Sequence, residues 1–230
     1  EKLMLGAPQV DANTVGLWHL DETSGTGAYI KDTANTNHGT PTGTTVADGF
    51  SGKARSFNGS SDYVTVTDSN STDFGSSTNF TLELWVKLNS LSRQTFIEKR
   101  ANSPLPYGQG YYFYVNSNGT LGSSLTNTSS YCDFTGTGTI KAGQWYHLAF
   151  VVNRGAPATE YFYINGTQDS STSCTNNFDI SNAVNLSIGA YQTGGLAEYL
   201  NGSIDEVKVS NTARSADEIA EAFRAGRDHR

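Results

Sequence analysis

Acidic residues near opposite ends of the chain carry the strongest chemical signal in the sequence. Asp21 and Glu22 directly follow an apolar run at 15–20, and Asp205 lies inside the apolar segment 202–210. Burying a carboxylate in such a segment is costly unless a cation or several hydrogen-bond donors neutralise it. We therefore expect a metal that ties the two ends of the chain together. The alternative is that these acids only accept backbone hydrogen bonds or cap turns.

A group of tyrosines could bind sugars, because aromatic faces stack on sugar rings while neighbouring polar side chains bond the hydroxyls. They gather in Gly-, Asn- and Ser-rich segments, which we expect to form loops at 101–110, 127–138 and 190–201. If these loops meet at one end of the fold, the residues lining a shallow site would be Tyr107, Tyr131, Asp133, Tyr191, Gln192 and Tyr199. Packing within the sheets is the alternative, and it is the expectation for Tyr112 and Tyr114.

The residues that could support catalysis are isolated. Glu83 has Trp85 and Lys87 at the next positions of its face, whereas glycoside hydrolysis requires a pair of carboxylates. The four histidines are scattered, without the spacing of a transition-metal site. We therefore expect a protein that is not an enzyme. A divergent glycoside hydrolase or polysaccharide lyase is the weakest alternative.

The two cysteines, Cys132 and Cys174, both lie in Ser-, Thr- and Asn-rich sequence that is typical of exposed loops. We expect them to form a disulfide, as in secreted proteins, since free structural cysteine is usually buried. Closing this loop would stabilise the fold by about 4 kcal/mol if the geometry allows the bond. Two unpaired thiols in a reducing compartment are the alternative.

The composition of the chain limits the classes of partner that it could bind. The net charge of −7 disfavours nucleic acid, which requires a basic surface, and suits a cation or a sugar. No apolar run approaches the length of a membrane-spanning helix, so we expect no membrane insertion. Together with the expected disulfide, this indicates an extracellular protein, either secreted or on the cell surface.

Alternating apolar residues and turn signals predict an all-β chain. At 80–86, Phe80, Leu82, Leu84 and Val86 share one face of a strand. Strand signals occur at 15–20, 54–58, 62–67, 80–88, 94–100, 110–116, 145–153, 160–165, 184–190 and 202–210. A short helix is expected at 215–225.

The start of this helix has a capping box, Ser215 and Glu218, whose side chains can satisfy free backbone N–H groups of the first turn. We expect a linker or edge segment at 1–13, one β-sandwich domain at 14–226 and a tail at 227–230.

Six short motifs occur in an order that resembles the laminin-G-like domains of the concanavalin A-like lectin/glucanase superfamily. They are LWHLDE (17–22), SFNGSSDYV (56–64), FTLELWVK (80–87), GQWYHLAFV (143–151), FYING (162–166) and GSIDEVKVS (202–210). The resemblance implies a two-sheet antiparallel β-sandwich, a jelly roll, with a short C-terminal helix. It covers nearly the whole chain but is weak evidence for any particular ligand, because one fold hosts many functions.

The resemblance also implies a structural calcium joining the first strand, a turn after an early strand and the last strand. Carried over, the ligands would be Asp21, the carbonyl groups of Asn58 and Gly59, and Asp205. The function implied is a non-catalytic module of a larger secreted protein that binds a polysaccharide or a cell-surface glycan. The alternative is a structural or protein-binding adhesion domain without a sugar site, which would bury the loop tyrosines instead of presenting them together.

Overall fold

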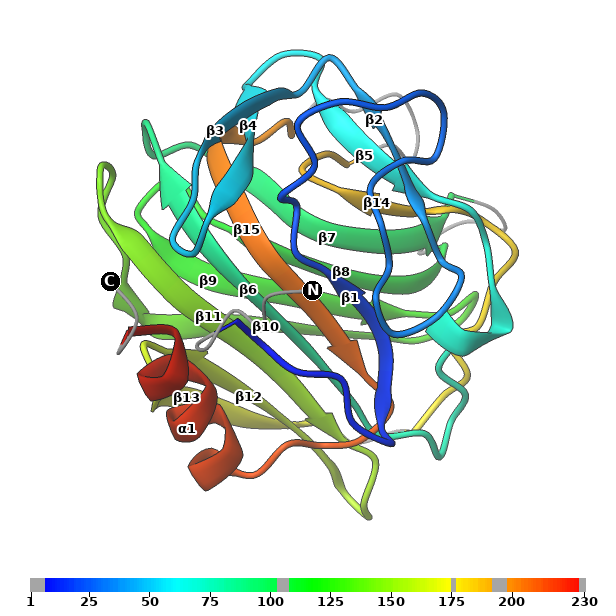
Figure 1. Cartoon of the computed structure of the whole chain (residues 1–230). Coiled ribbons are helices and arrows are strands. Elements are labelled where there is room, and N and C mark those ends of the chain that lie inside the picture. The colour runs from blue at the N-terminus through cyan, green and yellow to red at the C-terminus, as the bar shows by residue number, and fades with distance from the viewer. Residues whose placement is uncertain (1–6, 103–107, 175–176, 192–197, 228–230) are drawn as a thin grey trace.

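The computed structural model describes residues 7–102, 108–174, 177–191 and 198–227. Two antiparallel β-sheets stack face to face, and a single helix, α1 (Ala216–Arg227), lies against the outside of one of them (Figure 1). The all-β sandwich expected from the alternating pattern is therefore confirmed. No helix in the described part of the chain is long and apolar enough to cross a membrane.

The first sheet contains the last strand of the chain near its centre. Its strand order is β13 (Thr167–Cys174), β12 (Ala158–Ile164), β11 (Trp145–Asn153), β6 (Phe80–Leu88), β15 (Asn201–Ser210), β4 (Lys53–Asn58) and β3 (Thr45–Asp48). A further strand, β1 (Thr14–Trp18), pairs antiparallel with β15. The two ends of the chain are thus hydrogen-bonded to each other.

The second sheet is built mostly from the middle of the chain. Its strand order is β10 (Tyr131–Thr139), β9 (Thr120–Thr126), β8 (Gln109–Val115), β7 (Gln94–Ala101), β14 (Leu186–Ile188), β5 (Tyr63–Val66) and β2 (Gly39–Thr42). A single 3₁₀ turn, η1 (Asn70–Thr72), follows β5. Each strand predicted from the sequence overlaps an observed strand, whereas β2, β3, β9, β10 and β13 were not predicted.

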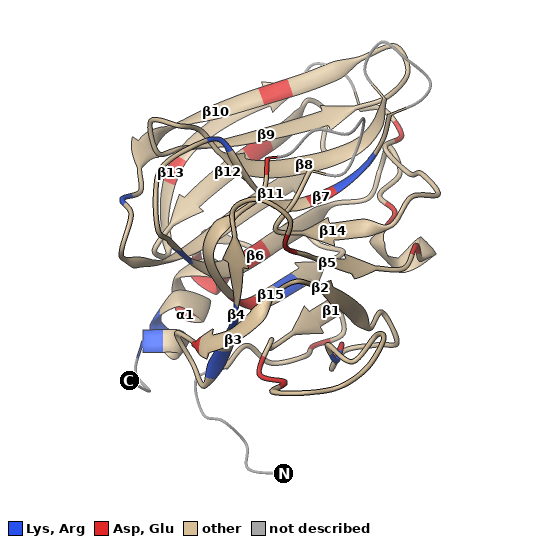
Figure 2. Ribbon diagram, turned by 90° about the horizontal axis from the view of Figure 1, so that it is seen from above, with Lys and Arg blue, Asp and Glu red and all other residues tan. Residues whose placement is uncertain are grey.

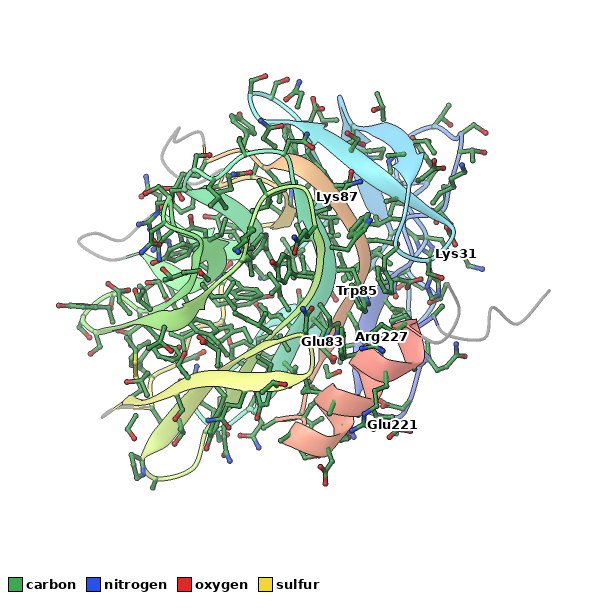
Figure 3. The ribbon with its side chains drawn as sticks, turned by 90° about the vertical axis from the view of Figure 1, so that its left-hand side faces the viewer. Lys31, Glu83, Trp85, Lys87, Glu221 and Arg227 are labelled. Atoms are coloured by element: carbon green, nitrogen blue, oxygen red, sulfur yellow. A yellow bond between two sulfur atoms is a disulfide. The ribbon has the colours of Figure 1, made fainter. Side chains whose placement is uncertain are left out.

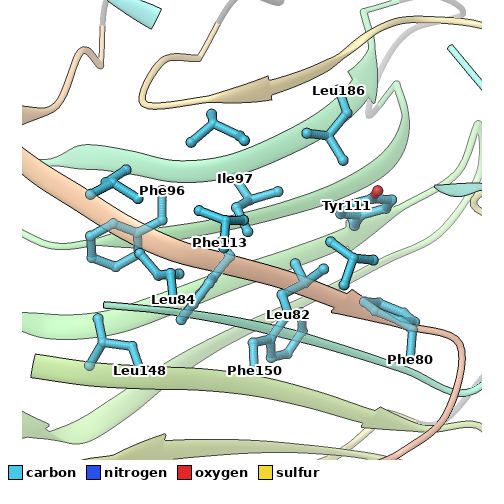
Figure 4. Packing of buried hydrophobic residues seen from close by; sticks show 14 of the residues in the cluster. Phe80, Leu82, Leu84, Phe96, Ile97, Tyr111, Phe113, Leu148, Phe150 and Leu186 are labelled. Atoms are coloured by element: carbon cyan, nitrogen blue, oxygen red, sulfur yellow. The ribbon is translucent and has the colours of Figure 1, made fainter. Parts of the chain in front are cut away.

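The core fills the space between the sheets. Phe80, Leu82, Leu84 and Val86 of β6 all belong to the main buried cluster, as their alternation predicts. Figure 4 shows the first three of them among the packed side chains. The intervening side chains of β6 point to the opposite face, where α1 lies. This outer face of the first sheet therefore combines polar and aromatic residues that the core does not use.

The helix begins as predicted. The Ser215 hydroxyl accepts a hydrogen bond from the backbone N–H of Glu218 (3.3 Å), and the Glu218 carboxylate accepts one from the backbone N–H of Ser215 (2.8 Å). Ile219 packs against Ala149, Val151 and Tyr163 on the outside of the first sheet. The capping box thus sets the start of α1, and one buried isoleucine anchors it.

A disulfide joins Cys132 to Cys174, with their Cα atoms 6.0 Å apart. It links β10 of the second sheet to β13 of the first and so ties the two layers together at one side. The prediction that both cysteines lie in loops was wrong. Both lie in strands, because Ser- and Thr-rich segments here pair with neighbouring strands despite their polar composition.

Candidate functional site

The outer face of the second sheet has a cleft of about 450 Å³ that we call the tyrosine cleft. It lies over β7, β8, β9 and β10 and is lined by Arg93, Arg100, Asn102, Tyr112, Tyr114, Ser124, Thr126, Tyr131, Asp133 and Tyr191. Aromatic rings, guanidinium groups, hydroxyls and a carboxylate thus share one surface.

Strand alternation explains how these residues come together. On β8, Tyr111 and Phe113 point into the core, so Tyr112 and Tyr114 must point outward. The strand register places Tyr112 opposite Ser124 on β9, and Ser124 opposite Asp133 on β10. Outward-facing positions of three adjacent strands therefore form a continuous row.

The tyrosine rings form the base of the cleft. Tyr112 stacks on Tyr114 with ring centroids 4.3 Å apart, and Tyr191 packs against Tyr112 at 5.2 Å. The guanidinium of Arg93 lies 4.2 Å from the centroid of the Tyr114 ring, and that of Arg100 lies 4.9 Å from the centroid of the Tyr191 ring. Such cation–π contacts hold both the rings and the guanidinium groups in place.

Hydrogen bonds fix the polar groups around these rings. Arg100 donates to the Tyr191 hydroxyl, and the Tyr112 hydroxyl donates to Glu198, which also pairs with Arg93 at 3.0 Å. Burial is the main cause of the raised pKa of Tyr114, so its hydroxyl stays protonated. The base of the cleft is thus a rigid hydrogen-bonded assembly.

The rim of the cleft is more accessible. Tyr131 is 54% exposed, the most exposed of the large hydrophobic side chains in the described part of the chain. Beside it, Asp133 accepts a hydrogen bond of 2.6 Å from the Ser124 hydroxyl, which leaves its other carboxylate oxygen available. An exposed ring next to an oriented carboxylate can stack on a sugar and accept hydrogen bonds from its hydroxyls.

The structure brings together part of the predicted sugar site. Tyr131, Asp133 and Tyr191 all line the tyrosine cleft. Tyr199 is half-buried and is not among the lining residues, and Tyr107 and Gln192 lie outside the described residues.

Tyr112 and Tyr114 are buried and packed on a sheet, as expected for tyrosines at strand positions. They pack with Tyr191 on the outer face of the second sheet and not in the core between the sheets, so they also form the base of the cleft. The outward position of Tyr112 and Tyr114 could have been predicted from the sequence. Only every second residue of a strand can face the core, and on this strand Tyr111 and Phe113 do. Arg93 and Arg100 were missed because no sequence signal indicated their stacking on these rings.

A second feature of interest is an acidic cluster formed by Asp21, Asp205 and Glu206. Asp205 lies next to the turn that joins β3 to β4 and accepts a hydrogen bond of 3.0 Å from the backbone N–H of Ser51. Asp21 reaches the same turn and accepts one of 2.6 Å from the backbone N–H of Lys53. The two carboxylates from opposite ends of the chain are therefore tied to one short turn.

One acid of this cluster has a basic partner: Glu206 Oε2 lies 2.6 Å from Nδ1 of His19. Burial, followed by the nearby charges of Glu206 and Asp21, raises the pKa of Asp205 to about 9. Oδ1 of Asp205 and Oε1 of Glu206 are buried and have no hydrogen-bond partner among the described residues. Glu206 also adopts a left-handed backbone conformation, with φ of 51°, within the irregular pairing of β15 with β6. A left-handed residue and two unpartnered carboxylate oxygens thus lie next to each other on β15.

The chemistry of this cluster fits a hard cation. Carboxylate and backbone oxygens are the ligands that Ca²⁺ prefers, and the cluster offers unpartnered oxygens of Asp205 and Glu206. The structure does not bring Asn58 and Gly59 to it. Strand pairing sets Asn58 opposite Asn201, four residues before Asp205 and so roughly 13 Å away along the strand.

Two further groups of titratable residues were considered as catalytic or metal-binding sites, and their contacts within the protein make them weaker candidates. Glu83 contacts His147 at 3.5 Å, and both side chains are buried. Among the described residues, Cys132, Glu160 and Cys174 are the group of metal-ligating types that lie within 4.8 Å of one another, and the cysteines of that group form the disulfide.

Solved structures of similar shape were found, although no curated protein matches the chain. The binding domain of Paraclostridial Mosquitocidal Protein 1 superposes with a TM-score of 0.74 at 19% identity, covering 92% of this chain and 52% of that one. Domain 4 of AbnA, an extracellular GH43 arabinanase from Geobacillus stearothermophilus, solved with arabinotriose, gives 0.67 at 22% identity and covers 92% and 98%.

A structure of botulinum neurotoxin type C, whose cell entry is described as dependent on two ganglioside molecules, gives 0.68 at 13% identity, covering 94% and 51%. The chain thus spans about half the length of the toxin structures and nearly all of the arabinanase domain. At these identities the similarity establishes a shared fold.

The comparison with protein families establishes the family as well as the fold. The family model for laminin-G-like domains of the concanavalin A-like lectin/glucanases superfamily matches residues 58–220. This range includes the tyrosine cleft, most of both sheets and the start of α1. Because the match spans more than half of the chain, the protein belongs to the concanavalin A-like lectin/glucanases superfamily.

Proposed function

We propose that the protein is a non-catalytic carbohydrate-binding module of a larger extracellular protein and that the tyrosine cleft holds the sugar. The observation that carries this proposal is the exposed ring of Tyr131 beside the oriented carboxylate of Asp133, above a fixed base of tyrosines and arginines. This combination of an aromatic surface with a few placed polar groups is what a sugar ring requires.

The structural neighbours support a binding role. One was solved with arabinotriose, another is named for its interaction with gangliosides, and a third is called a binding domain. The arabinanase domain is also part of a larger extracellular enzyme, and the disulfide of this protein suits the same environment. Glycans of a polysaccharide or of a cell surface are therefore the proposed ligands.

Affinity electrophoresis through a panel of polysaccharides, followed by calorimetry with the oligosaccharides that bind, tests this proposal. Tyr131→Ala should weaken binding about tenfold or more, because truncating an aromatic anchor commonly costs more than 1 kcal/mol. Asp133→Asn should weaken it too by removing a charged acceptor.

The matched control is Tyr63→Ala. Tyr63 lies on β5 of the same sheet, is half-buried and is not among the residues lining the tyrosine cleft. This variant should bind like the unmodified protein. The proposal fails if no glycan in the panel binds, or if Tyr131→Ala and Asp133→Asn both bind with unchanged affinity.

We also propose that the acidic cluster holds a structural calcium, with Asp21 and Asp205 among its ligands. The unpartnered buried oxygens of Asp205 and Glu206 support this proposal. A divalent cation would neutralise the carboxylates and link the strands that carry them. Its role would be to stabilise the fold, since the cluster lies on the first sheet and the tyrosine cleft on the second.

A further inference from the structure

The outer face of the first sheet has a second, larger cleft, which α1 covers only in part. The helix is anchored by Ile219, and beyond it an opening of about 690 Å³ remains between α1, β6, β11 and the β3–β4 turn. We call it the tryptophan cleft. In Figure 3, Trp85 and Lys87 project from β6 on the side of the sheet that carries α1, and Arg227 lies at the end of this helix.

Aromatic rings form the wall of this cleft. Phe50, on the β3–β4 turn, stacks on Trp85 with ring centroids 3.4 Å apart and planes within 9° of parallel. Trp145 on β11 meets Phe50 edge-on at 6.2 Å, and Phe223 of α1 lies 5.7 Å from Trp85. Trp85 is 2% exposed and so belongs to the base, whereas Trp145 is only half-buried. Phe223 is half-buried as well, so a ligand can reach the rings of Trp145 and Phe223.

The charged residues of the cleft are all cations. The Lys87 ammonium lies 5.5 Å from the Trp145 ring centroid, and the Arg227 guanidinium lies 5.5 Å from the Phe223 centroid. Neither forms an ion pair with a carboxylate in the described part of the chain, and no acid is among the residues that line the cleft. In a chain of net charge −7, whose basic residues are dispersed over the fold (Figure 2), two such cations at one site favour an anionic ligand.

The uncharged polar groups of the cleft also favour a ligand that accepts hydrogen bonds. The Asn165 side-chain oxygen accepts the backbone N–H of His147 (3.0 Å), and that of Gln144 accepts the Tyr146 hydroxyl (3.1 Å). These bonds orient both amides so that the NH₂ groups remain as donors, and neither NH₂ bonds to another described residue. The cleft therefore offers donors from Lys87, Arg227 and two amides, and it suits a ligand rich in acceptors.

From these contacts we propose that the tryptophan cleft is a second binding site, specific for an acidic saccharide whose sugar rings carry carboxylates. The apolar face of one ring stacks on Trp145, and its carboxylate accepts charge-assisted hydrogen bonds from Lys87 and Arg227. This site lies on the opposite sheet from the tyrosine cleft, so the proposal does not rest on the function assigned above.

Intrinsic fluorescence provides a direct measurement. The chain has three tryptophans; Trp18 is fully buried, and Trp85 and Trp145 line the cleft. Titrating the full chain with trigalacturonate should give a saturable change in tryptophan emission. The fully methyl-esterified trimer keeps the shape and loses the charge, and it should bind roughly tenfold more weakly or not at all because hydrogen bonds to charged groups are the stronger ones.

Variants locate the site. By calorimetry, Lys87→Gln and Trp145→Ala should each weaken trigalacturonate binding about tenfold or more, whereas Tyr131→Ala should not change it. Equal affinity for the acid and its ester, or no saturable change in emission, would overturn the proposal. So would loss of binding in Tyr131→Ala with normal binding in Trp145→Ala. That last result would mean that the acidic sugar binds in the tyrosine cleft, which would still agree with the proposed carbohydrate-binding function.

Discussion

Glu160 provides the sharpest test of the electrostatics of the core. It lies on β12, is fully buried between the sheets, and accepts a hydrogen bond of 2.8 Å from the hydroxyl of Ser123 on β9. Its other oxygen has no partner among the described residues. Burial raises its pKa from 4.5 to about 7, against the smaller lowering effects of Ser123 and Arg154.

The pKa shift sets the size and the sign of a pH effect. The native carboxyl keeps its proton between about pH 4.5 and 7, a range in which the unfolded chain has lost it. The native state therefore binds more protons there, and the free energy of unfolding must fall as the pH rises. At 1.36 kcal/mol per pKa unit, the fall is about 3 kcal/mol, complete above pH 7.

Urea unfolding of the native protein and of Glu160→Gln at pH 4 to 8 measures this effect. Glutamine keeps the shape and the acceptor for Ser123 but does not titrate, so the difference between the two proteins isolates Glu160. That difference should shift by about 3 kcal/mol in favour of the variant between pH 4 and pH 8. Glu221→Gln, which removes an exposed carboxylate from α1, is the control for the loss of one charge. A difference that stays constant for Glu160→Gln would refute the reasoning.

Two further predictions concern cross-links. The Cys132–Cys174 bond closes a loop with a sequence separation of 42, so its reduction, or replacement of both cysteines by alanine, should lower the free energy of unfolding by about 4 kcal/mol in urea titrations. Two thiols that alkylate freely in the native, unreduced protein would contradict this prediction. Calcium at a hundredfold excess over its Kd should add about 2.7 kcal/mol of stability, so chelation should lower Tm. Asp205→Asn should make Tm insensitive to chelator, whereas an unchanged Tm and no calcium by elemental analysis would exclude the metal.

The elements with regular alternation could be predicted from the sequence. Residues 80–88 were predicted as a strand with the observed bounds, and the signals at 202–210 and 215–225 match β15 and α1 closely. The strands Thr120–Thr126 and Tyr131–Thr139 were missed because Gly, Ser and Thr dominate them. Their strand conformation comes from pairing with β8, and such tertiary context commonly overrides local propensity.

The candidate sites were predictable only in part, for a similar reason. Tyr131 and Asp133 could be selected by residue type, although they lie on a strand and not in the expected loop. The aromatic wall of the tryptophan cleft could not be foreseen. Phe50 reaches Trp85 because β4 pairs with β15 and β15 with β6, and such registers depend on the whole sheet.

The position of β15 has a consequence for how the chain can fold. This strand is the last in the sequence, yet it pairs with β1, β4 and β6, all of which precede residue 90. During synthesis, the hydrogen-bonding edges of β4 and β6 that face each other cannot be satisfied natively until residues 201–210 have emerged from the ribosome. Unpaired strand edges are templates for aggregation, and contacts this distant in sequence form slowly. The closure that ties both ends of the chain together is therefore a late event, and the nascent protein is most exposed to misassembly just before it.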